Sequence, residues 1–208
     1  MNDADTMTIW RGQDPLILAS QSRARKMLLG NAGISFEAVP ADIDERSVQK
    51  NSGLSAPGEI AGLLAREKVL FVPSKNPGRY VVGADQTLAL GGRLFSKPAG
   101  RAQAAEQLRL LAGGTHELHS AVAVARDAKV MFSDVSVARM TMRRLDESGI
   151  EAYLGQAGQA VTTSVGAYQL EGLGVHLFER IEGDHFTILG LPLLPLLANL
   201  RGEGLLNV

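Results

Sequence analysis

An apolar run that ends in a carboxylate, Tyr80 to Asp85, constrains the fold of this chain more than any other feature. Such a run predicts a strand buried in a sheet, and ligands of α/β proteins bind outside the carboxyl ends of such strands. The apolar segments on either side of Gly91 and Gly92 predict a tight hairpin, which is followed by Lys97. Asp85 and Lys97 are therefore candidates for a base beside a phosphate-binding cation. A turn-capping aspartate and an exposed lysine would explain the pair equally well.

Segments with strand-like and helix-like spacing alternate along the rest of the chain. Further strands are expected at Leu16 to Ala19, Ser35 to Val39, Leu118 to Ala125, Val130 to Met142 and Val175 to Ile181. Helices are expected at Arg23 to Asn31, Glu59 to Val72, Gly100 to Leu111, Asp146 to Leu154 and Leu193 to Arg201. The acidic segment Ala41 to Arg46 is expected to continue into an exposed, mobile polar loop that extends to Gly58, and a strand is expected just before Gly190.

No internal repeat or break in composition divides the chain. We therefore expect one compact α/β unit, built around a mixed, partly antiparallel sheet that is flanked by helices, with a cleft between two lobes. Residues 1–14 are expected to form a flexible, solvated leader, 15–202 the folded domain and 203–208 a short tail.

The composition excludes several classes of protein. The 208 residues include no cysteine, which rules out thiolate metal sites and cysteine nucleophiles and fits a reducing cytoplasm. A net charge of -1 gives no basic footprint for nucleic acid. The longest apolar stretch, Phe186 to Leu200, is broken by two prolines and is too short to span a membrane, so no membrane partner is expected.

Three further constellations could carry chemistry. Ser20 to Lys26 places hydroxyls and cations at a helix amino terminus, which suits an anion, although a serine cap before a solvated basic face is the simpler explanation. Asp42, Asp44 and Glu45 offer oxygen ligands for Mg²⁺ or Mn²⁺, or form a merely solvated acidic loop. The glycine-rich segment Ser164 to Gly174 could bring its backbone and Glu171 to a ligand, and ordinary loop glycines explain it nearly as well.

Other common motifs are absent. No Walker loop, dinucleotide-binding glycine motif or nucleophile elbow occurs, and the four histidines do not have metal-ligand spacing.

Taken in order from Leu16 to Arg201, these segments resemble the Maf family, the septum-formation-inhibitor-like nucleoside triphosphate pyrophosphatases. The matching motifs are Ser20-Gln21-Ser22 to Arg25, Asp42 to Glu45, Ala65 to Lys68, Gly83-Ala84-Asp85-Gln86, Lys97-Pro98, Gly114-Thr115-His116, Glu182-Gly183-Asp184 and Gly190-Leu191-Pro192.

The resemblance implies hydrolysis of a nucleoside triphosphate between the α and β phosphates, in a nucleotide-binding cleft, with Mg²⁺ or Mn²⁺ as cofactor. Asp85 would be the proton acceptor and would hold the metal together with Glu45. Arg25, Lys68 and Lys97 would neutralise the phosphates and Ser20 would contact them, which suits a reaction that depends on positioning and charge neutralisation. A homodimer is also an expectation of the resemblance.

Within the family, Gln86 and Glu171 look like the group that acts on 7-methyl-GTP, because a carboxylate can accept hydrogen bonds from a guanine edge. That group tends to carry an aromatic residue where this chain has Ala24. Action on dTTP or UTP is the alternative within the family. A non-catalytic, nucleotide-binding regulator of cell division is the alternative from another class.

Overall fold

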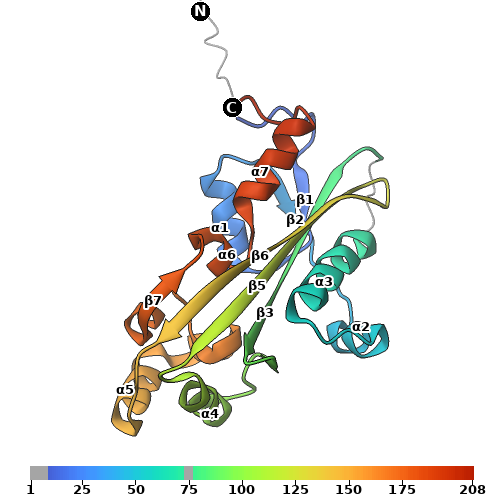
Figure 1. Ribbon diagram of the computed structural model, residues 1–208. Coiled ribbons are helices and arrows are strands. Elements are labelled where there is room, and N and C mark those ends of the chain that lie inside the picture. Colours follow the sequence, from blue (N-terminus) through green and yellow to red (C-terminus); the bar gives the residue numbers. More distant parts are fainter. Residues whose placement is uncertain (1–8, 73–76) are drawn as a thin grey trace, which may run out of the picture.

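The computed structural model describes residues 9–72 and 77–208, and over that range it consists of one mixed sheet with helices on both faces (Figure 1). The strands are β1 (Leu16–Leu18), β2 (Phe36–Ala38), β3 (Tyr80–Leu90), β4 (Arg93–Phe95), β5 (Thr115–Arg126), β6 (Lys129–Met142) and β7 (Phe178–Glu182). Their order is β2-β1-β3-β5-β6-β7, and β4 pairs with β3 outside this path. The predicted α/β fold, with a single compact unit around a mixed sheet, is confirmed.

Parallel pairing is confined to β1, which lies between β2 and β3, and the longer strands are antiparallel. The β5–β6 hairpin turns through Asp127 and Ala128, which have φ angles of 51° and 57°. Two consecutive residues in the left-handed region match the twist of the two strands, so this turn sets the register of the longest pairing in the sheet.

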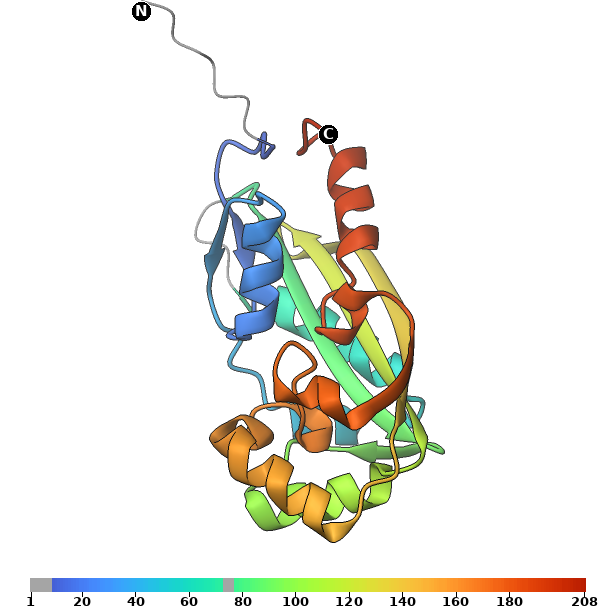
Figure 2. The same ribbon diagram turned by 90° about the vertical axis from the view of Figure 1, so that its left-hand side faces the viewer.

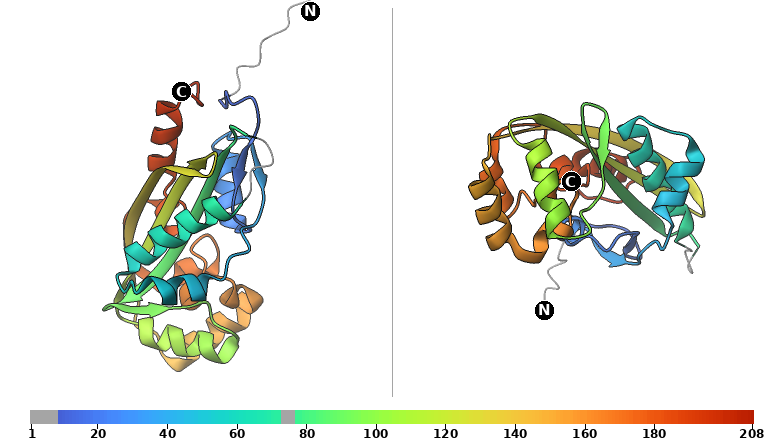
Figure 3. Two further views of the ribbon diagram at one scale, coloured as in Figure 1. Left: turned by 90° about the vertical axis from the view of Figure 1, so that its right-hand side faces the viewer. Right: turned by 90° about the horizontal axis from the view of Figure 1, so that it is seen from below.

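The helices are α1 (Arg23–Asn31), α2 (Glu45–Ser52), α3 (Pro57–Phe71), α4 (Arg101–Leu111), α5 (Glu147–Ala157), α6 (His185–Ile188) and α7 (Leu193–Gly202). Figure 3 shows α2 and α3 against one face of the sheet. In Figure 2, α1 and α7 lie at one end of the molecule and α4 and α5 at the other.

Two hydrophobic cores divide the sheet face that lies opposite α3. One core includes Val82 and Ala84 of β3 and packs against α1 and α7, whereas the other includes Leu88 and packs against α4 and α5. Because side chains alternate along a strand, Gln86 faces the same side as Ala84 and Leu88 and lies between the two cores.

The structure corrects four expectations. Residues 45–52 form helix α2 rather than a mobile loop, because Asp44 caps the helix by accepting a hydrogen bond of 3.0 Å from Ser47 N. Asp85 lies inside β3 rather than at its end. Residues 185–188 form the short helix α6 rather than a strand. Lys68 is buried instead of lying at the exposed edge of α3.

The predicted leader lies partly in residues 1–8, which are outside the described residues. Within residues 9–14, Trp10 is 8% exposed and forms a bridge with Leu206, so this segment packs on the folded unit near its carboxyl end.

Candidate active site

The site lies along an interruption in the pairing of β3. On one edge of β3, β1 pairs only at Val81 and Val82, and β4 pairs only from Leu88 to Leu90. Among the described residues, no strand covers the part of this edge between the two pairings. The interruption therefore leaves backbone groups of β3 accessible to side chains from α1, and Asp85 lies at its centre.

Asp85 projects from β3 toward α3, where it meets Lys68. Lys68 Nζ lies 2.5 Å from Asp85 Oδ1 and 2.7 Å from Glu45 Oε1, so one ammonium group joins two carboxylates. Lys68 and Asp85 are each 7% exposed, whereas the Glu45 side chain is 52% exposed. In Figure 1, α3 lies beside β3, and α2 lies next to α3.

Gly83 permits this contact, because it lets α3 approach the strand closely. A Cβ atom at Gly83 would lie 2.7 Å from both Ala65 O and Val69 Cγ1, and 3.2 Å from Lys68 Cβ. A side chain at this position would push away the turn of α3 that carries Lys68. Gly83, two residues before the candidate base, is therefore required for the close packing of α3 on β3.

Burial and charge act on Asp85 in opposite directions. Burial raises the pKa of Asp85 above its ordinary value of 3.8, because the charged form loses water, while Lys68 and Arg25 partly oppose the increase. For Arg25, burial lowers the pKa, and the carboxylates of Asp85 and Glu45 oppose that change. The carboxyl group of Asp85 is thus a stronger base than an exposed aspartate.

Arg25 connects the elements around the interruption. Its Nη1 donates to Ala84 O at 2.7 Å and to Ser20 Oγ at 3.4 Å, and its Nε donates to Gly190 O at 2.7 Å. Ser22 caps α1 by accepting a hydrogen bond from Arg25 N, which fixes the start of the helix that carries this arginine. Ser20 and Arg25 therefore lie together near Asp85, as predicted. Two of the hydrogen bonds of the Arg25 guanidinium go to backbone oxygens, those of Ala84 and Gly190.

Gln86 projects from the opposite face of β3, into a polar layer between the two cores. Its Nε2 lies 2.9 Å from Ser120 Oγ, 3.1 Å from Thr187 O and 3.0 Å from Ile188 O, so the orientation of the amide is fixed by three acceptors. Ser120 Oγ also donates to Thr187 O at 2.7 Å. Ser120 and Thr187 were not predicted, because in the sequence each is only a polar residue within an apolar segment.

Three predicted site residues lie outside the cluster around Asp85: Gln86 is bonded on the opposite face of β3, and Lys97 and Glu171 make no bond to the cluster within the described part of the chain. The side chains of Lys97 and Glu171 are exposed, and no hydrogen bond or ion pair among residues 9–72 and 77–208 links either to Asp85. Lys97 follows β4, the strand that borders the interruption, while Glu171 lies in the segment before the 3₁₀ helix Leu173–Leu177.

The donor set at the site suits a metal that also binds the substrate. In the described part of the chain, no group of three or more His, Cys, Asp or Glu residues could hold a metal ion. Glu45 and Asp85 nevertheless converge on one positive charge, the ammonium group of Lys68. Mg²⁺ commonly uses one or two carboxylates together with phosphate oxygens. Asp44 is engaged instead as the cap of α2.

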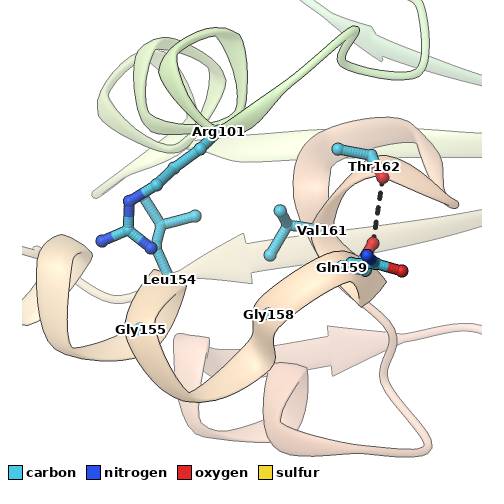
Figure 4. Close-up of a pocket in the computed structure, with 7 residues that line it drawn as sticks. All are labelled: Arg101, Leu154, Gly155, Gly158, Gln159, Val161 and Thr162. Carbon is cyan, nitrogen blue, oxygen red and sulfur yellow. Dashed lines mark hydrogen bonds between the residues drawn. The ribbon is translucent and has the colours of Figure 1, made fainter.

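A cavity of about 340 Å³ near the carboxyl end of α5 lies outside this site (Figure 4). Its lining includes Arg101, which is paired with Glu151 at 2.6 Å, and none of the predicted site residues. It therefore has no part in the chemistry described here.

Comparison with known proteins identifies the family of the chain. The Maf-like protein family matches residues 15–203, which include every predicted site residue. The chain belongs to the Maf family.

Relatives of this Maf protein are similar over almost their whole length. A nucleoside triphosphate pyrophosphatase of Bradyrhizobium diazoefficiens is 70% identical over 202 residues, which cover 97% of this chain and 100% of that protein. A protein with the same name from Nitrobacter winogradskyi is 66% identical over the same shares. A 7-methyl-GTP pyrophosphatase of Brucella abortus is 52% identical over 191 residues, or 90% of this chain and 96% of that protein. Among the described residues, no helix is long and apolar enough to cross a membrane.

Proposed function

We propose that this protein hydrolyses nucleoside triphosphates between the α and β phosphates, releasing a nucleoside monophosphate and pyrophosphate. The observation that carries the proposal is the cluster of Asp85, Lys68, Glu45 and Arg25 at the interruption of β3. It combines a base with cations in a partly dry site, and phosphoryl transfer needs positioning and charge neutralisation more than covalent chemistry. The names of the Bradyrhizobium and Nitrobacter relatives support the same reaction.

In this proposal, Asp85 accepts a proton from the attacking water, and its raised pKa brings its basicity closer to neutral pH. Lys68 and Lys97 bind the phosphates, and Arg25 and Ser20 hold the rim of the site in place while contacting them. Glu45 and Asp85 hold a divalent cation, Mg²⁺ or Mn²⁺, which supplies charge neutralisation on the phosphates.

The proposed substrate is 7-methyl-GTP or a similar modified nucleotide. The 52% identical Brucella relative carries that name, and Gln86 and Glu171 offer amide and carboxylate groups for a purine edge. Hydrolysis of such nucleotides would remove non-standard precursors from the cell.

The test is pyrophosphate release from 7-methyl-GTP, GTP, dTTP, UTP and CTP with Mg²⁺ or Mn²⁺. Preference for 7-methyl-GTP would support the proposed substrate, and preference for dTTP or UTP would assign the other group of the family. Absence of release from every nucleotide with either metal would favour a nucleotide-binding regulator and contradict the proposed reaction.

A further inference from the structure

Lys68 occupies the centre of the pair of carboxylates to which the proposed function assigns a metal ion. Its ammonium lies 2.7 Å from Glu45 Oε1 and 2.5 Å from Asp85 Oδ1, and its side chain is 9% exposed. Divalent cations such as Mg²⁺ take carboxylate oxygens as ligands. The ammonium and a metal ion would therefore compete for the same two groups.

We propose that Lys68 is an exchangeable substitute for the metal ion. It holds Glu45 and Asp85 together before a metal ion binds, and it leaves them for the phosphates of the substrate when a divalent cation binds. This inference rests on the proposed function, because that function places the metal on Glu45 and Asp85. A lysine suits the role, since its charge is compact and is carried on a flexible four-carbon chain.

The need for a substitute follows from burial. Asp85 is 7% exposed, and a buried carboxylate without a partner is strongly unfavourable. Lys68 supplies that partner before any ligand arrives. Glu45 is 52% exposed in the first turn of α2, so it can adjust to a different cation without disturbing a core.

The exchange also changes the charge of the site in the direction that the substrate requires. The two carboxylates are balanced by Lys68 and Arg25, and these four groups lie within electrostatic reach of one another. A divalent cation on the carboxylates neutralises them and leaves the charges of Lys68 and Arg25 without a counter-charge, so the site becomes positive. A positive site binds a polyphosphate, whereas the balanced site does not attract one.

A second consequence concerns the base. Asp85 Oδ1 accepts a hydrogen bond from Lys68. That oxygen becomes available to a water molecule only after Lys68 has moved. One of the two carboxylate oxygens of Asp85 is therefore occupied until metal and nucleotide are both present.

The first test is calorimetric titration with Mg²⁺, without nucleotide, of the wild-type protein and the variants Lys68→Met and Lys68→Gln. Glutamine can still donate to Asp85, so it keeps the test available if the methionine variant fails to fold. Arg66→Met is the matched control, because it removes a positive charge from the same helix. We expect both Lys68 variants to bind Mg²⁺ at least tenfold more tightly than wild type, and the Arg66 variant within twofold of it.

Equal affinity of wild type and the Lys68 variants would overturn the proposal, as would failure of every variant to bind Mg²⁺. A gain of equal size in Arg66→Met would assign the effect to general charge and would also overturn it.

The second test observes the ammonium group of Lys68 directly in the wild-type protein by ¹H–¹⁵N NMR, with its signal assigned from the Lys68→Gln variant. Saturating Mg²⁺ and a non-hydrolysable nucleotide should shift that signal or broaden it through faster proton exchange. An unchanged signal at saturation would refute the exchange. Pyrophosphate release by wild type is measured separately, so that failure of the exchange and failure of the proposed function can be told apart.

Discussion

Asp85 shows how much a single residue in this protein depends on its surroundings. It is a carboxylate in the interior of a long strand, and it is retained there by Lys68 at 2.5 Å and by the charge of Arg25. Burial raises its pKa, which makes the ionised form a better proton acceptor. The sequence predicted Asp85 as a candidate base. It did not predict that the carboxylate lies inside the strand, because its partners Lys68 and Arg25 are distant in the chain.

The raised pKa gives a prediction about the pH dependence of activity. Only the ionised form of Asp85 can accept a proton, so kcat/KM should rise with pH and reach half of its plateau above 3.8, the ordinary value for an aspartate. A pH profile of pyrophosphate release, measured with a substrate that does not titrate in this range, checks it. A half-maximal point at or below that ordinary value would argue against Asp85 as the base.

His116 gives a second prediction at the residue scale, which concerns stability. It is fully buried, its Nε2 lies 2.7 Å from the Tyr168 hydroxyl, and burial lowers its pKa from 6.5 to about 4. At a pH between about 4 and 6.5, His116 is therefore protonated in the unfolded chain but not in the folded protein. The folded state should lose up to about 3 kcal/mol of stability as the pH falls from 6.5 to 4, and none of this loss occurs above 6.5.

Denaturant unfolding at several pH values, with His116→Gln for comparison, measures this effect. The variant should have a lower stability at pH 7 and a smaller loss of stability between pH 6.5 and 4. An identical pH dependence in the two proteins would assign the loss to other groups.

At the scale of elements, the contact between α3 and β3 places Lys68 beside Asp85. The close approach depends on Gly83, and the hydroxyl of Thr87 adds a hydrogen bond of 3.0 Å to Pro57 O at the start of the helix. The apolar spacing of residues 59–72 predicted the helix itself. It did not predict that Lys68 is buried, because a lysine is usually solvated and its partner Asp85 comes from another element.

Gly83→Ala tests this contact. The added Cβ would lie 2.7 Å from Ala65 O, so α3 must shift, and we expect a loss of about 1–3 kcal/mol in the free energy of unfolding. Catalysis should fall as well, because the shift moves Lys68. Gly155→Ala in α5 is the control: its Cβ would meet nothing within 4 Å, and the change should leave stability equal or higher. Equal unfolding energies of Gly83→Ala and wild type would show that the contact is not tight.

Other elements show what local sequence leaves open. Helix α2 has no buried residue and therefore no apolar stripe, and its signal was the capping pair Asp44 and Ser47 rather than periodicity. Helix α6 has only four residues, and its sequence around Phe186 and Ile188 is equally suited to a strand. The β3–β4 hairpin and the longer helices were predicted because the turn glycines of the hairpin and the apolar spacing of the helices agree with the structure there.

At the scale of the whole molecule, two cores share the long strands, and the candidate site lies where β1 ends and β4 has not yet begun. The pairing of Trp10 with Leu206 joins the two ends of the described chain on the core that contains α1 and α7. The sequence predicted a mixed sheet and one folded unit. The interruption in the pairing of β3 was not predictable, because it depends on where β1 ends and where β4 begins along β3.

The central claim is that Asp85 is the base of a nucleoside triphosphate pyrophosphatase. The most direct measurement is kcat for pyrophosphate release by Asp85→Asn, beside Asp134→Asn, which makes the same change on β6. Asparagine preserves the shape, and Lys68 keeps Glu45 as a partner, so the variant should remain folded and bind nucleotide. We predict that Asp85→Asn lowers kcat about 10²- to 10⁴-fold, whereas Asp134→Asn stays close to wild type. Turnover of Asp85→Asn within a few-fold of wild type would contradict the claim.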